Sequence, residues 1–203
     1  MNSNCSHNPV LLIHGIFRKS GIFSKMSGHL TQLGWSVYSL NLTPNWGNAS
    51  LEDLAQQMAD YIDTNFSPQQ PLDLVGLSMG GLVTRYYLQR LGGINRVQRF
   101  IAISSPHSGT WMAYTMWGKG CIQMRPGSAF LEELNRDAIV LEKLNFTSIW
   151  TPWDFIIVPA SSSQISAAKD VKLSVFAHVM MACNSRSLKA VAEALSEPFK
   201  LEN

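Results

Sequence analysis

Short apolar runs alternate with amphipathic helical patterns along almost the whole chain. A continuous apolar run is typical of a strand covered on both faces, and apolar residues three and four positions apart are typical of a helix. Six segments have the strand pattern: 9–15, 35–42, 72–78, 97–105, 146–150 and 172–177. Helical patterns occupy 23–33, 50–65, 80–91, 128–144 and 187–195. This alternation predicts an α/β fold with a mostly parallel sheet of about six strands and helices on both faces.

The length and composition suit a globular protein. The chain has 203 residues, 46% of them hydrophobic and 15% charged, so we expect a single domain over residues 1–203. No apolar stretch approaches the roughly 18 residues of a membrane-spanning helix, and the first residues lack the apolar centre of a secretory signal. Cys5, Cys121 and Cys183 lie far apart without a C-x-x-C pair, so we expect neither a disulfide framework nor a zinc site. These features favour a cytoplasmic location.

The charges are unevenly distributed, although the net charge is only +2. No acidic residue occurs before Glu52, and none occurs between Asp73 and Glu132. Such cationic stretches are suited to peripheral contact with an anionic membrane surface or to acidic substrates, and the alternative is a solvated face. The basic residues form no recognisable nucleic-acid-binding motif, so we expect no nucleic-acid partner.

A serine lies where one strand pattern changes to a helical one. Apolar residues run continuously up to Leu77 and recur at helical spacing from Leu82. Between them the residues GLSMG at 76–80 form a complete G-x-S-x-G motif around Ser78. On a sharp strand-to-helix turn this motif is a nucleophile elbow, which raises the serine Oγ above the end of the sheet. The alternative is a glycine-rich turn with an exposed serine.

A nucleophilic serine needs a histidine base and an acid that orients the base. After an elbow these follow the serine in the order acid, then histidine. No Asp or Glu separates Ser78 from His107, so this order selects His178 as the base. The alternative for His178 is a hydrogen-bonded core histidine. We expect His14, which precedes the serine, to brace its loop, and His107 to have a structural role as well.

The position of each acid in the predicted fold selects one candidate between Ser78 and His178. Asp170 comes just before the strand 172–177, which places it at the opposite end of the sheet from Ser78. Asp154 follows the strand 146–150, at the carboxyl end where parallel sheets bind ligands. We therefore predict Asp154 as the acid, and the alternative is that it only caps its loop. The other acids lie on the polar face of the helix predicted over 128–144: Glu132, Glu133, Asp137 and Glu142.

The tetrahedral intermediate of acyl transfer carries an oxyanion that needs preorganised N–H donors. After an elbow, one donor is the backbone N–H of the next residue, here Met79, and the other comes from the loop after the first strand. The sequence HGIF at 14–17 lets that loop turn in over the serine. Either Ile16 or Phe17 is therefore predicted as the second donor, and this mechanism needs no metal.

The chain resembles the small α/β-hydrolase lipases and esterases in five segments and a late histidine. The segments are HGI at 14–16, GLSMGG at 76–81, SSPHSGT at 104–110, MRPGSAFLEELN at 124–135 and WDFIIVP at 153–159. The resemblance covers nearly the whole chain and is to minimal bacterial triacylglycerol lipases and related cyanobacterial and plastid lipase-like proteins. It implies an α/β-hydrolase fold without a large lid domain, hydrolysis of acyl esters by Ser78, Asp154 and His178, and no cofactor. Leu77 and Ala177 depart from the pattern, which often has His or Tyr before the serine and Gly before the histidine.

Large apolar side chains concentrate in the loop 105–127. We predict that Trp111, Met112 and Trp117, with Trp153 from a neighbouring loop, bind the acyl chain of the substrate, and the alternative is that they only cover the core. The predicted function is hydrolysis of acyl esters of glycerolipids or triacylglycerols through an acyl-enzyme. The alternatives are a short-chain carboxylesterase, an acyltransferase or thioesterase with the same triad, or a non-catalytic lipid-binding scaffold.

Overall fold

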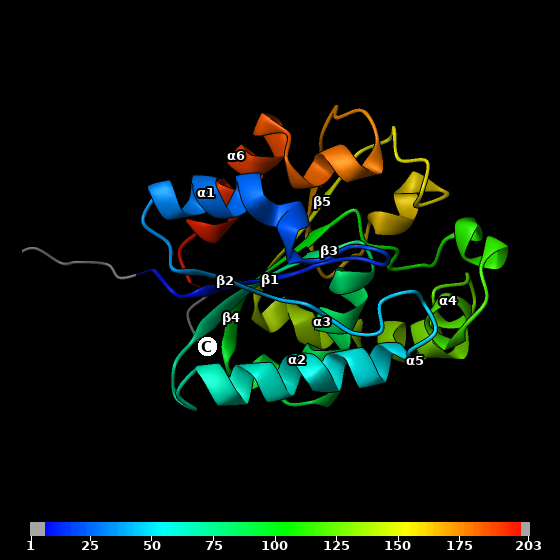
Figure 1. Ribbon diagram of the computed structural model, residues 1–203, viewed down its shortest axis with the longest axis horizontal. Helices are drawn as coiled ribbons and strands as arrows, with labels where there is room; N and C mark the ends of the chain where they lie inside the picture. The colour runs from blue at the N-terminus through cyan, green and yellow to red at the C-terminus, as the bar shows by residue number, and fades with distance from the viewer. Residues whose placement is uncertain (1–6, 200–203) are drawn as a thin grey trace, which may run out of the picture.

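Six parallel strands form one sheet in the computed structural model, which describes residues 7–199 (Figure 1). Their order across the sheet is β2-β1-β3-β4-β5-β6, and each neighbouring pair is parallel. The strands are β1 (Val10–Ile13), β2 (Val37–Leu40), β3 (Leu72–Leu77), β4 (Val97–Ile103), β5 (Asn145–Trp150) and β6 (Lys169–Lys172). The predicted six-stranded α/β architecture is confirmed.

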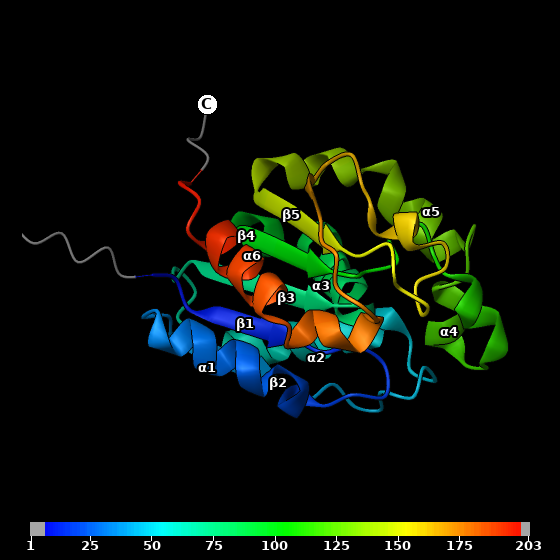
Figure 2. The same ribbon diagram turned by 90° about the horizontal axis from the view of Figure 1, so that it is seen from above.

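Helices cover both faces of the sheet (Figures 1 and 2). One face carries α1 (Ser24–Gln32) and α6 (Ser185–Leu195), and the other carries α2 (Leu51–Asn65), α3 (Met79–Arg90) and α5 (Ala129–Arg136). A short helix, α4 (Lys119–Gln123), contacts α2 and α5. The 3-10 helices are η1 (Ser20–Phe23), η2 (Gly93–Asn95), η3 (Trp111–Thr115), η4 (Ala138–Lys143), η5 (Ala160–Ser163) and η6 (His178–Ala182). Residues 7–199 fold around this sheet without a large lid domain.

The two helical layers divide the core into two clusters. Strand β1 contributes Leu11 and Ile13 to the cluster that contains the buried side chains of α2 and α3. Its alternate residues, Val10 and Leu12, belong to the cluster formed with α1 and α6. Successive side chains of a strand point to opposite faces of a sheet, so an entirely apolar strand supplies both clusters.

Strand β6 differs from the prediction, which placed it at 172–177. The strand is Lys169–Lys172 at the edge of the sheet, where it pairs only with β5. An edge strand is half exposed, so it carries charged residues that a search for apolar runs does not detect. The apolar residues that follow it leave the sheet, and Val175 joins the α1 and α6 cluster instead. Asp170 therefore lies within β6, where it accepts a hydrogen bond from Trp150 Nε1 at 2.7 Å.

The prediction of one continuous helix over 128–144 is also wrong. Helix α5 ends at Arg136, and a separate 3-10 helix, η4, follows it. They meet at Asp137, whose carboxylate accepts hydrogen bonds from Gln89 Nε2 at 2.8 Å and from Arg90 Nη1 at 2.6 Å. The predicted apolar face is nevertheless buried: Leu131, Leu134, Ala138, Leu141 and Leu144.

The carboxyl ends of the six strands point to the same edge of the sheet, and the loops that hold Ser78, Asp154 and His178 gather there (Figure 2). Of the helices in residues 7–199, none is long and apolar enough to cross a bilayer. Cys121 and Cys183 are free thiols, and Cys5 lies outside the described residues.

Candidate active site

Ser78 occupies a strained turn between β3 and α3. Its φ is 56° and its ψ is −123°, a backbone conformation that L residues rarely adopt. Its N–H donates to the Ile103 carbonyl of the neighbouring strand at 2.8 Å, which holds the turn against the sheet. A Cβ added at Gly76 would lie 2.7 Å from Gly81 Cα, so strand and helix approach as closely as an elbow requires. The local geometry therefore has the form predicted for a nucleophile elbow.

His178 and Asp154 come together from two different loops. Nδ1 of His178, at the start of η6, lies 2.7 Å from Oδ2 of Asp154, in the loop after β5. The other carboxylate oxygen, Oδ1, accepts hydrogen bonds from the backbone N–H groups of Ile156 and Ile157, both at 2.9 Å. The two side chains are almost entirely buried. Each oxygen of Asp154 is thus engaged, and one of them orients the imidazole.

The environment of Asp154 keeps the carboxyl ionised. Burial raises the pKa of Asp154, but the hydrogen bond and charge of His178, together with the Ile156 and Ile157 N–H groups, outweigh burial. The pKa of this carboxyl consequently lies below its ordinary value. A carboxylate at this position accepts a hydrogen bond from Nδ1–H and leaves Nε2 of His178 as the proton acceptor.

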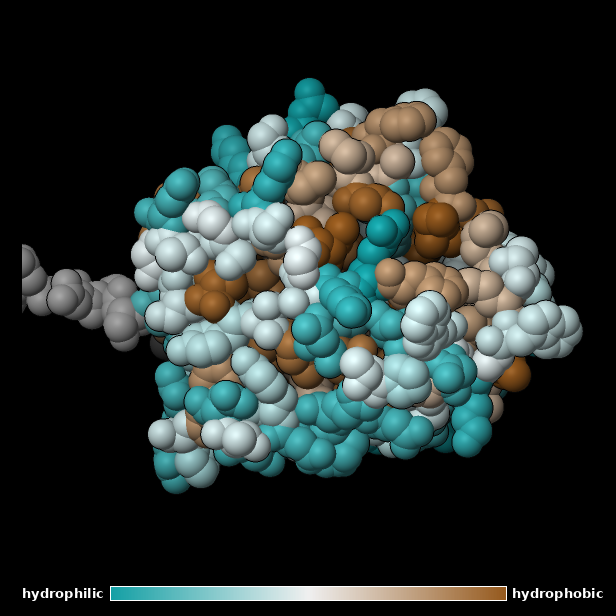
Figure 3. Space-filling model, in the orientation of Figure 1, coloured by the Kyte–Doolittle hydropathy of each residue, from teal (hydrophilic) through white to brown (hydrophobic). Residues whose placement is uncertain are grey.

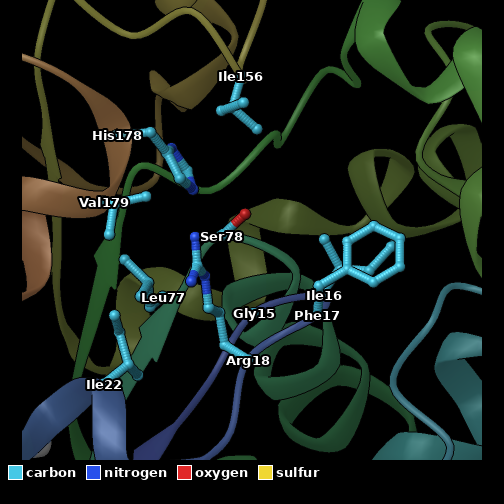
Figure 4. Close-up of a pocket in the computed structure, with 10 residues that line it drawn as sticks. All are labelled: Gly15, Ile16, Phe17, Arg18, Ile22, Leu77, Ser78, Ile156, His178 and Val179. Atoms are coloured by element: carbon cyan, nitrogen blue, oxygen red, sulfur yellow. The ribbon is translucent and has the colours of Figure 1, made fainter.

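Ser78 and His178 line the same pocket at the carboxyl edge of the sheet (Figure 4). The His178 ring points toward the side of the pocket where Ser78 lies, and Ile156 faces both from the opposite wall. The remaining lining residues are Gly15, Ile16, Phe17, Arg18, Ile22, Leu77 and Val179. The pocket is mostly apolar, with one hydroxyl and one imidazole that can react.

The loop after β1 passes directly beside the serine. A Cβ added at Gly15 would lie only 2.9 Å from the Cβ of Ser78. Phe17 has a left-handed backbone with φ of 56°, and its N–H donates to the carbonyl of Asn45 at 2.9 Å. In residues 7–199 no such acceptor occurs for the N–H of Ile16. Met79 is the first residue of α3, where backbone N–H groups have no partner within the helix.

The other two histidines near the strand ends are buried. His14 Nε2 accepts a hydrogen bond from the Leu42 N–H at 3.0 Å, and Nδ1 bonds the Gly15 carbonyl at 2.9 Å, so His14 braces its loop as predicted. His107 packs edge-on against Phe146, with ring centroids 5.9 Å apart. Within the described part of the chain, neither ring nitrogen of His107 has a hydrogen-bond partner. Burial, and secondly the charge of Arg85, lowers the pKa of His107 well below its ordinary value.

The four residues predicted to bind the acyl chain do not line this pocket. Trp111 stacks on Tyr114 outside it, Trp117 is 84% exposed and Trp153 is 53% exposed, while Met112 is half-buried. The pocket walls come instead from residues that the sequence reasoning did not select: Arg18, Ile22, Leu77, Ile156 and Val179. Ile156 and Val179 follow closely after the predicted acid and base in the sequence. This proximity is the sequence feature that indicates a position in the pocket wall.

Exposed apolar side chains surround the pocket. Figure 3 shows tan and brown side chains gathered over the loops that follow β5 and β6, in the upper right of the view. Large side chains of these and neighbouring loops are exposed by about half or more: Phe17, Trp46, Trp111, Trp117, Trp153, Phe155 and Phe176. Large exposed apolar patches often mark interaction sites.

Solved structures of known hydrolases share this fold. Lipase B of Aspergillus fumigatus superposes with a TM-score of 0.80 at 22% identity, over 95% of this chain and 53% of that lipase. The mature Bacillus licheniformis lipase BlEst2 gives 0.79 at 13% identity, over 97% and 95% of the two chains. MGS-MChE2, an α/β-hydrolase from the sediment metagenome of the Mar Chica lagoon in Morocco, gives 0.68 at 15% identity, over 92% and 90%. This chain therefore has the α/β-hydrolase fold, and it spans about half the length of the Aspergillus lipase.

The sequence also matches a family model. The model describes palmitoyl protein thioesterases and matches residues 9–153, which is more than half of the chain. The matched segment contains the elbow around Ser78 and ends one residue before Asp154. This small lipase- and esterase-like α/β-hydrolase belongs to the palmitoyl protein thioesterase family.

Proposed function

We propose that this protein is a serine hydrolase that cleaves acyl esters of lipids, with Ser78 as nucleophile, His178 as base and Asp154 as orienting acid. The 2.7 Å contact between His178 Nδ1 and Asp154 Oδ2, at a pocket that Ser78 also lines, carries this proposal. A histidine held in this way has Nε2 available for a serine proton. The family and its structural neighbours are hydrolases, which supports ester hydrolysis as the general chemistry.

The reaction proceeds in two halves. Ser78 Oγ attacks the carbonyl carbon of the substrate, and its proton passes to Nε2 of His178. The tetrahedral intermediate collapses, the leaving alcohol takes that proton, and the acyl group remains on Ser78 as an ester. In the second half, water gives a proton to His178 and attacks the acyl-enzyme. Collapse releases the fatty acid and returns a proton to Ser78 Oγ.

Backbone N–H groups of Ile16 and Met79 stabilise the oxyanion in this proposal. Of the two predicted candidates in the loop after β1, Phe17 already donates its N–H to the Asn45 carbonyl, which favours Ile16. The close approach of Gly15 to Ser78 supports this, since Ile16 is the next residue and lines the same pocket. Met79 supplies the second donor from the first turn of α3, where the helix dipole favours negative charge.

The proposed substrate is a long-chain acyl ester of a glycerolipid or triacylglycerol. Most of the residues that line the pocket have apolar side chains, which suit an acyl chain: Ile16, Phe17, Ile22, Leu77, Ile156 and Val179. A thioester is the second candidate, because the matching family model describes palmitoyl protein thioesterases. Both candidates place a fatty acyl group on Ser78 and differ only in the leaving group.

We also propose that the exposed apolar side chains around the pocket contact an anionic membrane surface. Trp117 and Phe176 are 84% and 71% exposed. Two lysines are exposed as well: Lys19 in the loop after β1, and Lys119 at the start of α4. Aromatic side chains settle at the lipid interface, and lysines are attracted to anionic headgroups. Sedimentation with vesicles of phosphatidylglycerol tests this contact, and equal sedimentation with neutral phosphatidylcholine would contradict the electrostatic part.

The decisive experiment for the reaction is labelling with a fluorophosphonate, followed by hydrolysis of p-nitrophenyl esters from acetyl to palmitoyl and of palmitoyl thioesters. We expect stoichiometric labelling of the wild type, none of Ser78→Ala, and normal labelling of Ser108→Ala, whose serine is exposed on a neighbouring loop. Rates that rise with chain length support a lipid substrate. Labelling of Ser78→Ala equal to that of the wild type would refute the proposed nucleophile.

A further inference from the structure

Among the described residues that line the pocket, one carries a permanent charge, and this residue is Arg18. The other lining residues are apolar or glycine, apart from Ser78 and His178. In Figure 4 the Arg18 side chain extends from the loop after β1 toward Ser78, with its guanidinium facing the serine. The reaction proposed above does not use this group.

The backbone of Arg18 is held in place by a turn and by Asn45. The Arg18 N–H donates to the Gly15 carbonyl at 3.3 Å, which closes a turn around Phe17. Asn45 bonds the turn twice: its carbonyl accepts from the Phe17 N–H at 2.9 Å, and its side-chain Nδ2 donates to the Arg18 carbonyl. The backbone of Arg18 is therefore anchored, and its exposed side chain extends from this fixed point toward Ser78 (Figure 4).

Nothing in the described residues neutralises this guanidinium. It forms no ion pair or hydrogen bond with another side chain in residues 7–199. The sequence has no acid before Glu52, and the nearby carboxylate of Asp154 is occupied by His178 and two backbone N–H groups. Arg18 is exposed to solvent and has no acidic partner among the described residues, so an anion that enters the pocket can pair with it without displacing a protein group.

We propose that Arg18 binds an anionic phosphate group of the substrate next to the scissile ester, so that the substrate class is a glycerophospholipid. This inference rests on the proposed ester hydrolysis and narrows its substrate. In a glycerophospholipid the phosphate is attached to the glycerol carbon beside one that carries an acyl ester. A guanidinium close to Ser78 therefore meets the phosphate when that ester carbonyl lies at the serine.

The chemistry of the two groups is complementary. Guanidinium presents a planar pair of donors that bonds two phosphate oxygens at once, and such charge-assisted bonds are about twice as strong as neutral ones. A triacylglycerol offers Arg18 only neutral ester oxygens, which accept weaker hydrogen bonds from a guanidinium than the oxygens of a phosphate anion do. The selectivity thus arises from the stronger, charge-assisted contact with the phospholipid.

The test compares two soluble substrates with identical short acyl chains, a phosphatidylglycerol and a neutral diacylglycerol, both below their micelle concentrations. The measured quantity is the ratio of kcat/KM for the phospholipid to kcat/KM for the neutral lipid. We expect Arg18→Ala to lower this ratio about tenfold to a hundredfold, mainly through KM, as loss of a charge-assisted hydrogen bond implies. Arg18→Lys should recover part of the ratio because it keeps the charge.

Lys25→Ala is the control, since Lys25 is an exposed cation in the first turn of α1 and does not line the pocket. An equal fall in the ratio for Lys25→Ala would overturn the assignment in favour of general surface charge. Equal losses on both lipids for Arg18→Ala would overturn it as well. The rate of fluorophosphonate labelling reports whether the serine site of Arg18→Ala remains intact.

Two further measurements are needed. The first distinguishes binding of a lipid phosphate from binding of free phosphate, and the second distinguishes failure of this inference from failure of the proposed function. A lysophospholipid and inorganic phosphate are added as competitors. Competition by inorganic phosphate as strong as that by the lysophospholipid would show a free-phosphate site and overturn the assignment to a lipid. Hydrolysis of the neutral lipid in preference to the phospholipid by the wild type overturns the role of Arg18 alone. Hydrolysis of neither lipid, with no labelling of Ser78, overturns the proposed function together with this inference.

Discussion

Asp154 Oδ2 lies 2.7 Å from Nδ1 of His178, although the two residues belong to separate loops that follow β5 and β6. The contact is almost entirely buried, and backbone N–H groups hold the other oxygen of the carboxylate. A buried, hydrogen-bonded carboxylate determines which nitrogen of the imidazole carries the proton. The following predictions depend on this arrangement and on the loops around it.

Asp154→Asn should lower kcat by about 10⁴-fold while the fold is retained. The amide oxygen still accepts the Ile156 and Ile157 N–H groups, but the amide nitrogen donates to His178 and favours the wrong tautomer. Steady-state hydrolysis of a p-nitrophenyl ester measures the loss. Asp170→Asn is the matched control, because Asp170 lies within β6 and bonds Trp150 Nε1. A loss below tenfold for Asp154→Asn would contradict the role of this carboxylate.

Gly15→Ala should lower kcat by about 10²–10³-fold, the loss typical of one oxyanion donor. The added Cβ would lie 2.9 Å from Ser78 Cβ and 3.2 Å from the Leu77 carbonyl oxygen, so the loop must move away and carry the Ile16 N–H with it. Gly21→Ala is the control, because a Cβ there meets nothing within 4 Å. Wild-type kcat in Gly15→Ala would show that this loop supplies no donor to the reaction.

In the variant His107→Leu, the free energy of unfolding should fall less than in the wild type when the pH is lowered into the mildly acidic range. The pKa of His107 is lowered by burial, so below its unfolded value of 6.5 the unfolded chain binds the extra proton and the folded chain does not. The free energy of unfolding therefore falls as pH decreases below that value, by up to about 1.4 kcal/mol per pH unit for one such group. Stability from this source is fully present above the unfolded pKa and is lost as pH falls toward the folded one.

Urea unfolding of both proteins at about pH 8, 7, 6 and 5 measures this dependence. His14 contributes in the same direction, because burial lowers its pKa too, so His107→Leu should reduce the slope and leave a remainder. The values at about pH 8 serve as the reference, since both histidines are neutral there in either state. Identical slopes for wild type and variant would contradict the buried neutral state of His107.

Asp73→Ala should destabilise the fold by about 3–5 kcal/mol, because it leaves Arg99 as an uncompensated buried charge. Asp73 is fully buried at the amino end of β3 and lies 3.0 Å from Arg99 Nη1, and it also bonds Asn8 Nδ2 at 3.0 Å. Asp63→Ala is the control, because the Asp63 side chain in its pair with Arg96 is 78% exposed, and such pairs contribute about 0–1 kcal/mol. Equal unfolding free energies for the two variants would contradict this difference.

The sequence by itself determined five of the six strands, the parallel arrangement and the turn at Ser78, since these depend on local periodicity and on glycines at fixed spacing. It also selected Asp154 and His178, because chain order and the common carboxyl edge of a parallel sheet restrict which loops can meet. It located β6 incorrectly, since an edge strand is stabilised by one neighbour and carries exposed charges.

Only the tertiary structure decided which side chains line the pocket and which N–H groups stay unpaired. The Phe17 N–H is engaged by the carbonyl of Asn45, a residue from another loop, and no local pattern predicts that contact. Arg18 enters the pocket for the same reason, while Trp111 and Trp117 remain outside it. The paths of loops depend on contacts between residues distant in sequence, whereas periodicity records only which face of a helix or strand is buried.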